Sequence, residues 1–381
     1  METQTQKSVA AKNKNLDIII RIVTVIALLF AFLVGIKVLG SSFKLMGGGF
    51  AKGLISVTSN PILGLFSGMF ATVLIQSSSV TTSLIVGLVA SGALPLTGAI
   101  PMIMGANLGT SVTNSLVSLG YIKNQKHFRD AFAAATVHDF FNILTVAVLL
   151  PIELATGYLE KTAVYMSNML YGSVSGFKFS SPIKAAIKPV AGGVKSFVTE
   201  TLGISGTASG VALAIISALI IITALTMIVK TMKVVVESNK GEIVNNLLSK
   251  NGYLAILFGT LLTISVQSSS ITTSLLVPMA GAGVLSLRSI LPVTIGANIG
   301  TTTTALLAAL AGNATGLAIA LVHFLFNVSG MLLWYVHPKM RNVPLILCEK
   351  LADMTLRNRA HGILYITGVF FIFPLIITAL L

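Results

Sequence analysis

The chain has 381 residues, of which 54% are hydrophobic and only 9% are charged, and its mean hydropathy is +0.92. Soluble domains carry roughly 25% charged residues, so the composition excludes a soluble globular protein and indicates an integral membrane protein. The formal net charge of +14 comes from Lys and Arg at the ends of apolar segments, which is typical of loops that face anionic headgroups. No basic stripe interleaved with aromatic residues is visible, which argues against nucleic-acid binding.

The first half begins with a polar stretch, residues 1–15, which we expect to be a disordered cytoplasmic tail. Its lysines precede an apolar run, as in a signal peptide, but the run is too long and lacks a clear cleavage site. A first span from about Leu16 to Phe43 is long enough to cross a hydrocarbon core of about 30 Å. The glycine run Gly47–Gly49 predicts its end.

An apolar segment, 53–75, leads into Gln76, and a second apolar piece follows to about Gly92. Two half-length pieces that meet at a polar residue predict a re-entrant hairpin or a broken helix. Because a break facing lipid leaves backbone groups unsatisfied, this break should line a cavity or be buried in protein. A basic turn, Lys123–Arg129, then precedes a helix from about Ala131 to Leu154.

Residues 156–207 are less apolar and dotted with lysines, and we expect a linker there. A span from about Val211 to Val229 follows, then a charged amphipathic segment to Lys250, a second polar hairpin and a helix from about Leu317 to Val336. The predicted organisation is a first transmembrane repeat at 16–155, a second at 208–340, and a basic loop with an extra C-terminal transmembrane helix at 341–381. The single cysteine, Cys348, excludes an intramolecular disulfide.

A polar block that occurs twice organises the chain. Gln76–Ser79 (Gln-Ser-Ser-Ser) recurs as Gln267–Ser270, and 29 residues after the start of each copy comes a second block, Gly105–Thr110 or Gly296–Thr301. About half of the 38 positions in Gln76–Thr113 match the positions 191 residues later without a gap, which indicates internal duplication. Whether the halves are inverted or parallel depends on an odd or even number of crossings. We expect an all-α polytopic membrane protein with two inverted repeats, each with one interrupted segment of the kind that marks a transporter's binding site.

The repeated blocks place hydroxyl and amide groups where a helix begins. Free backbone N–H groups and the positive end of the helix dipole favour a small oxyanion there, while hydroxyl and carbonyl oxygens suit a desolvated alkali cation. Packing between helices is the commoner role for any single serine, but a whole block repeated in fixed register favours ion binding. The candidate anion ligands are Ser77, Ser78, Ser79, Ser268, Ser269, Ser270, Asn107 and Asn298.

His138 and His323 each precede an asparagine, Asn142 or Asn327, by four residues, so that each pair shares a helix face. We interpret both histidines as buried, hydrogen-bonded structural residues. Asp139 differs, because an acidic residue between apolar neighbours in a span is costly and is a functional candidate by default. Its counterpart in the second half is a phenylalanine, so a cation bound at this aspartate would make the halves asymmetric.

These motifs resemble the type II sodium-dependent phosphate cotransporters, whose hallmark is a duplicated Gln-Ser-Ser-Ser sequence. The resemblance covers about 50–155 and 208–340 and includes Arg129–Asn142 and Gly296–Thr304. The size and short linker resemble a bacterial member, because animal relatives carry a large glycosylated, disulfide-bonded loop between the halves. The resemblance therefore implies a multi-pass protein of a bacterial inner membrane.

The resemblance further implies symport of sodium and inorganic phosphate by alternating access, with sodium as coupling ion and no cofactor. It implies that Gln267, Ser268, Thr301 and Thr304 bind one sodium and that serines of both motifs surround phosphate. An aspartate at the Asp139 position goes with an extra sodium in electrogenic members, where three sodium ions and one divalent phosphate move one net positive charge. The full set of expected sodium ligands is Gln76, Gln267, Ser268, Thr301, Thr304, Thr110, Thr113 and Asp139.

Two alternatives remain open at this stage. The first is a sodium-coupled transporter of another small anion or of a neutral solute. The second, an intramembrane serine hydrolase, needs a serine paired with a base, but no Gly-x-Ser-x-Gly elbow surrounds either serine block, so we expect no enzymatic activity. Beyond sodium, phosphate and the bilayer, a homodimer is compatible with exposed apolar helix faces.

Overall fold

The computed structural model describes residues 2–172, 182–236 and 251–381, which form a bundle of helices with no strand among them. Within these ranges six helices are long and apolar enough to cross a membrane. They are Ile19–Met46, Gln125–Thr156, Gly206–Ile228, Leu287–Leu310, Ala314–Val336 and Ala360–Leu380. The predicted all-helical, multi-pass architecture is therefore confirmed.

The helices follow the two halves of the sequence. The first half contains α1 (Glu2–Thr58), α2 (Pro61–Ile75), α3 (Ser78–Ser91), α4 (Leu96–Thr110), α5 (Val112–Leu119), α6 (Gln125–Thr156) and α7 (Tyr158–Gly172), and α8 (Pro182–Ser196) connects the halves. The second half contains α9 (Gly206–Val236), α11 (Gly252–Val266), α12 (Ser269–Ser274), α13 (Leu276–Gly281), α14 (Leu287–Leu310) and α15 (Ala314–Met331). The last helices are α16 (Pro338–Arg357), α17 (Ala360–Thr367) and α18 (Phe373–Leu380).

Helix α1 is longer at both ends than the sequence predicted. It begins at Glu2, so the expected disordered tail is helical, and it continues through Gly47–Gly49 to Thr58. A glycine in a helix costs only about 1 kcal/mol relative to alanine, and α1 packs along α9 over much of its length. The expected linker at 156–207 is also largely helical, through α7 and α8. The end of the predicted amphipathic segment, 237–250, lies outside the described residues.

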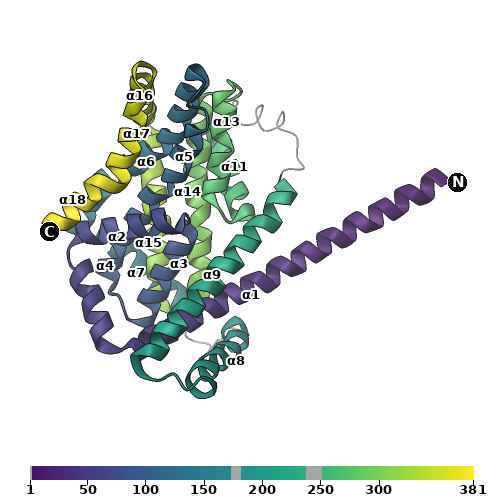
Figure 1. Cartoon of the computed structure of the whole chain (residues 1–381), viewed down its shortest axis with the longest axis vertical. Helices are drawn as coiled ribbons and strands as arrows, with labels where there is room; N and C mark the ends of the chain where they lie inside the picture. The colour runs from purple at the N-terminus through teal and green to yellow at the C-terminus, as the bar shows by residue number, and fades with distance from the viewer. Residues whose placement is uncertain (1, 173–181, 237–250) are drawn as a thin grey trace.

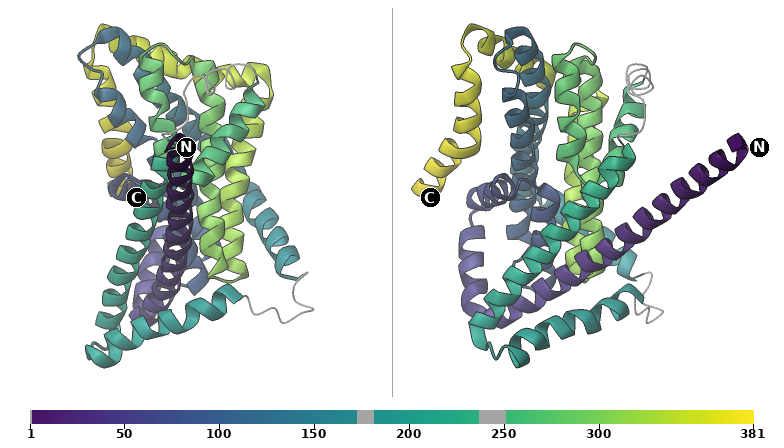
Figure 2. Two further views of the ribbon diagram at one scale, coloured as in Figure 1. Left: turned by 90° about the vertical axis from the view of Figure 1, so that its right-hand side faces the viewer. Right: turned by 45° about the vertical axis from the view of Figure 1, so that its right-hand side comes forward.

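The first helices of the two halves cross and run in opposite directions. Figure 1 shows α1 descending from the N-terminus while α9 ascends from the bottom of the bundle. In both views of Figure 2 the C-terminal helices lie along one side of the bundle.

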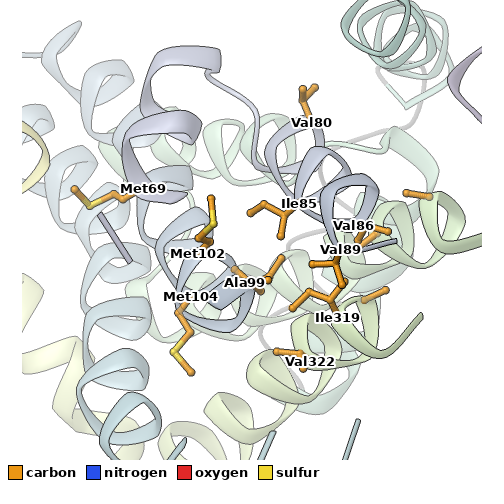
Figure 3. Close-up of a cluster of buried hydrophobic side chains, with 14 of the residues drawn as sticks. Met69, Val80, Ile85, Val86, Val89, Ala99, Met102, Met104, Ile319 and Val322 are labelled. Carbon is orange, nitrogen blue, oxygen red and sulfur yellow. The ribbon is translucent and has the colours of Figure 1, made fainter. Parts of the chain in front are cut away.

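A buried apolar core joins α2, α3, α4 and α15. Figure 3 shows Ile319 and Val322 of α15 beside Val86 and Val89 of α3, and all four side chains are buried. Helix α3 begins in the first serine block, and α15 belongs to the second half. The core therefore fixes the first serine block against the second half of the chain.

Glycines of the repeated Gly-Ala-Asn block bring two helices of each half into backbone contact. A Cβ added at Gly105 of α4 would lie 1.7 Å from the Leu65 carbonyl oxygen of α2, and one at Gly296 of α14 would lie 2.0 Å from that of Ile256 on α11. No side chain fits at either position. These glycines therefore allow the two helices to approach closely, as small residues do between membrane helices.

Candidate functional site

Both Gln-Ser-Ser-Ser blocks lie at a break between two helices, and the two breaks have the same backbone geometry. Helix α2 ends at Gln76 (φ 57°, ψ 28°), and α11 ends at Gln267 (φ 56°, ψ 27°). These are the only non-glycine residues with positive φ in the part of the chain that the structure describes. Ser77 and Ser268 then cap the following helices, because each Oγ accepts a hydrogen bond from the backbone N–H three residues later. Each capping hydroxyl keeps its own proton free for donation.

Each glutamine contacts the threonine that follows the Gly-Ala-Asn block of its own half. Thr113 Oγ1 donates to Gln76 Oε1 at 3.1 Å, and Thr304 Oγ1 donates to Gln267 Oε1 at 2.9 Å. The two pairs are 191 residues apart in sequence. Each half therefore gathers an amide oxygen, a hydroxyl and a helix break at one point.

The two breaks meet at one cavity of 310 Å³. Its polar lining comes from both halves and carries no ionisable side chain. These polar residues are Gln76, Ser77, Thr113, Thr226, Gln267, Ser268, Ser270 and Ser274. Ser79 Oγ also donates to the Gln267 carbonyl oxygen at 3.5 Å, which links the breaks directly. The cavity is thus a neutral, hydroxyl-rich space between the two repeats.

Other residues predicted for the site do not line this cavity. Ser78, Ser79 and Ser269 are buried in the helices behind it. Thr110 and Thr301 turn back onto the carbonyl oxygens four residues earlier in their own helices. The predicted set therefore divides into a cavity-lining group and a supporting group.

Asn298 belongs to a buried network that crosses between the halves. His138 Nε2 lies 2.7 Å from Asn298 Oδ1, and Asn298 Nδ2 donates to Asn142 Oδ1 at 2.7 Å. On the other ring nitrogen, Asn114 Nδ2 lies 3.2 Å from His138 Nδ1. Thr273 and Ser274 both donate to Asn114 Oδ1 at 3.0 Å, which leaves Asn114 Nδ2 to donate and makes His138 Nδ1 the acceptor. The structural interpretation of His138 therefore fits its contacts: its partners are amides rather than a serine nucleophile.

Asp139 lies apart from the cavity and is fully buried. Ser115 Oγ donates to Asp139 Oδ2 at 3.2 Å, and Ser111 and Tyr365 lie close to the same carboxylate. Oδ1 has no partner with hydrogen-bond geometry among the described residues. A buried acceptor without a hydrogen-bond partner is costly, so a cation bound at this carboxylate would relieve that cost.

Sequence reasoning missed three parts of the site. Thr226 comes from α9, outside both repeated blocks, and Asn114 has an alanine 191 residues later, so the repeat gave no signal for either. The sequence repeat could have identified Gly68 and Gly259 as sites of close helix packing. They are 191 residues apart, and a Cβ on either would lie 2.0 to 2.2 Å from a carbonyl oxygen of the neighbouring helix.

A larger cavity of 690 Å³ lies between α2, α4, α6 and the C-terminal helices. Its lining is almost entirely apolar, with Leu65, Met69, Ile143 and Phe373 among its walls. Apart from Ser111 and Tyr365 beside Asp139, its walls offer an ion no ligands to replace its hydration. The smaller polar cavity is therefore the candidate functional site.

The chain is similar in sequence to known proteins. The model of the Na+/Pi-cotransporter family matches residues 31–172 and 220–349. The chain is 34% identical over 449 residues to human (Homo sapiens) sodium-dependent phosphate transport protein 2B, covering 94% of this chain and 65% of the relative. It is 35% identical over 426 residues to rat (Rattus norvegicus) sodium-dependent phosphate transport protein 2A, covering 93% of this chain and 67% of the relative.

The chain thus spans about two thirds of the length of these relatives, and slightly less in the human case. No solved structure matches it. The family model covers both halves, including both serine blocks and both Gly-Ala-Asn blocks. The chain therefore belongs to the Na+/Pi-cotransporter family.

Proposed function

We propose that this protein is a symporter that couples the entry of sodium to the uptake of inorganic phosphate by alternating access. The observation that carries the proposal is the cavity where the two Gln-Ser-Ser-Ser breaks meet. Family membership and the names of the relatives support it, since those proteins are sodium-dependent phosphate transporters. The relatives are transporters, which fits a protein that is not an enzyme.

The lining of the cavity suits phosphate better than sulfate. Serine and threonine hydroxyls both donate and accept hydrogen bonds, whereas a guanidinium or ammonium group only donates. Hydrogen phosphate carries a proton that a hydroxyl oxygen can accept, but sulfate at neutral pH has none to offer. Ser77, Ser268 and Ser270 line the cavity, which supports them as the side chains that make these contacts.

The neutral cavity also accounts for coupling to sodium. A doubly charged anion cannot leave water for a site without positive charge unless cations accompany it. In the second half, Gln267 Oε1, Thr304 Oγ1 and the Ser268 hydroxyl offer hard oxygen ligands within the same break. Phosphate and sodium therefore each lower the cost of binding the other.

Two finer points belong to this proposal. The opposite directions of α1 and α9 support inverted repeats, in which one repeat moves against the other around a fixed midplane site. The buried Asp139 carboxylate supports an additional sodium, giving three sodium ions per divalent phosphate and one net positive charge per cycle. Inward transport across a bacterial inner membrane fits such a cycle.

The direct test is uptake of radiolabelled phosphate into proteoliposomes with an inward sodium gradient and a voltage set by potassium and valinomycin. We expect sodium-dependent uptake that an inside-negative voltage accelerates. Unlabelled arsenate should compete strongly and sulfate weakly, because only arsenate shares the protonated tetrahedral form of phosphate.

The outcomes separate the parts of the proposal. Sodium-dependent but voltage-insensitive uptake would keep the symporter and remove the additional sodium. Strong competition by sulfate would contradict the hydroxyl argument. Absence of sodium-dependent uptake by demonstrably folded protein would overturn the phosphate assignment.

A further inference from the structure

Two polar side chains of the first half and one of the second half are joined by hydrogen bonds, here called the first clamp, whereas their three counterparts are not. The first clamp consists of His138 and Asn142 on α6 and Asn298 on α14. Asn298 lies between the other two: its Oδ1 is 2.7 Å from His138 Nε2, and its Nδ2 donates to Asn142 Oδ1 at 2.7 Å. The clamp is complete, since both ends of the Asn298 amide are used.

The sequence contains the same three residues a second time. Asn107 on α4 corresponds to Asn298 at the 191-residue spacing, and His323 and Asn327 on α15 follow His138 and Asn142 by 185 residues each. The supporting helices are also paired alike, because α4 packs against α15 as α14 packs against α6. A second clamp can therefore form from Asn107, His323 and Asn327.

In this structure the second clamp is open. Asn327 Nδ2 donates to the His323 carbonyl oxygen at 3.0 Å, and Asn107 Nδ2 donates to the Ile103 carbonyl oxygen at 2.9 Å, so both amides turn back to their own helices. His323 Nδ1 and Asn327 Oδ1 are buried without a hydrogen-bond partner among the residues that the structure describes. Leaving two buried polar atoms unpaired is unfavourable, and another state of the protein can relieve it.

We propose that the second clamp closes in the oppositely facing state of the transport cycle, and that the first clamp opens there. The two halves of a duplicated transporter exchange roles as the site changes sides, so the polar contacts made by one half in one state are made by the other half in the next. Asn107, His323 and Asn327 are then positioning residues that stabilise the second state. The inference depends on alternating access as proposed above, but not on the identity of the substrate.

The test measures the equilibrium between the facing states with a reporter in the cavity. Thr226, on α9, lines the cavity, so the rates at which a membrane-impermeant thiol reagent labels a T226C variant from the two sides should report the side to which the cavity is open. The native Cys348 is fully buried, so the parent chain without the T226C change should not be labelled and serves as the negative control. In oriented proteoliposomes, the ratio of labelling rates from the two sides reports the ratio of the two states.

Substitutions in the two clamps should shift this ratio in opposite directions. Asn327→Leu removes an amide that makes no contact between the halves in this state, so it should favour this state by roughly three- to tenfold, the effect of about one net hydrogen bond. Asn142→Leu breaks the first clamp and should shift the ratio the other way by a similar factor. Asn107→Leu is the second variant for the open clamp and should act like Asn327→Leu.

A double variant makes the test specific. If Asn107 and Asn327 contact each other only in the second state, the combination of both leucines should shift the ratio no further than either alone. A shift in the same direction by the variants of both clamps, an unchanged ratio in Asn327→Leu, or an additive double variant would overturn the second clamp. An unchanged labelling ratio in Asn327→Leu would mean that water alone satisfies the unpaired atoms of His323 and Asn327.

The readout separates this inference from the proposed function. The labelling ratio can be measured without phosphate or sodium. Opposite shifts in a protein that takes up no phosphate would therefore contradict only the assignment of phosphate as the substrate. Labelling from one side alone, in the parent reporter and in every variant, would contradict exchange between two states and with it the clamp.

Discussion

Gln76 and Gln267 hold the helix breaks in a left-handed backbone conformation that favours glycine. A non-glycine residue there costs roughly 1 kcal/mol or more, so both positions keep glutamine against a local penalty. The amide of each glutamine contacts a threonine of the repeated block. The side chain, rather than the backbone, therefore explains why glutamine occupies both breaks.

Gln267→Gly tests this at a single residue. The change relieves the backbone cost, so the folded protein should be at least as stable, but it removes the amide oxygen beside Thr304. We expect the sodium concentration for half-maximal uptake to rise several-fold, as measured in proteoliposomes. Gln76→Gly is the matched variant of the first half. Unchanged sodium dependence in Gln267→Gly would remove this glutamine from the sodium site.

Asp139→Asn tests the additional cation. Moving one charge across the membrane is worth about 2.3 kcal/mol per 100 mV, so loss of that charge should abolish the acceleration of uptake by an inside-negative voltage while sodium dependence remains. Asp130→Asn is the control, because Asp130 lies at the start of the same helix in a partly exposed ion pair with Arg129. Voltage-dependent uptake by Asp139→Asn would contradict a cation at this carboxylate.

At the scale of helices, close packing of α4 on α2 and of α14 on α11 sets the shape of each half. The contacts are made at glycines whose missing side chains leave backbone against backbone. The threonines that reach the glutamines follow these glycines closely in sequence, so the packing sets where the hydroxyls lie. Helix spacing and ion-site geometry are thus coupled.

Gly105→Ala should therefore destabilise the protein, because the new Cβ would lie 1.7 Å from the Leu65 carbonyl oxygen. Overpacking of this kind typically costs about 1–3 kcal/mol. The thermal midpoint can be followed through alkylation of Cys348, which is fully buried and whose pKa burial raises to about 12, so the folded protein leaves it protonated and unreactive.

Gly368→Ala is the control, since nothing lies within 4 Å of a Cβ added there. Its midpoint should match that of the parent chain or exceed it slightly. Equal midpoints for Gly105→Ala and Gly368→Ala would show that the α2–α4 contact has room to spare, contrary to the structure.

At the scale of the whole molecule, the duplicated halves share one cavity but differ in their polar contacts. The first clamp is closed and the second open, and Asp139 has no acidic counterpart in the second half. A symmetric pair of halves would give no preference between facing states. Under the alternating access proposed above, these differences would set which facing state the structure represents.

Much of this protein follows from sequence alone. Composition and the length of apolar runs predicted five of the six candidate membrane spans of the described residues, because the hydrocarbon core imposes a minimum length of apolar helix. The sixth, Leu287–Leu310, lies where a polar hairpin was expected. The 191-residue repeat identified Gln76, Gln267 and the serine blocks, because duplication repeats side chains in fixed register. The predicted end of the first helix at Gly47–Gly49 was wrong, because α1 continues to Thr58. Its packing on α9 outweighs the small cost of glycine in a helix.

Only the tertiary structure decided which polar groups face the cavity. Ser77 and Ser268 line it while Ser78 and Ser269 lie behind it, because consecutive residues at the start of a helix point about 100° apart. Thr226 and Asn114 join the site from positions without a repeat signal. The open second clamp is likewise invisible in sequence: its residues are the same as those of the closed one, and only their placement in space determines which set can form hydrogen bonds.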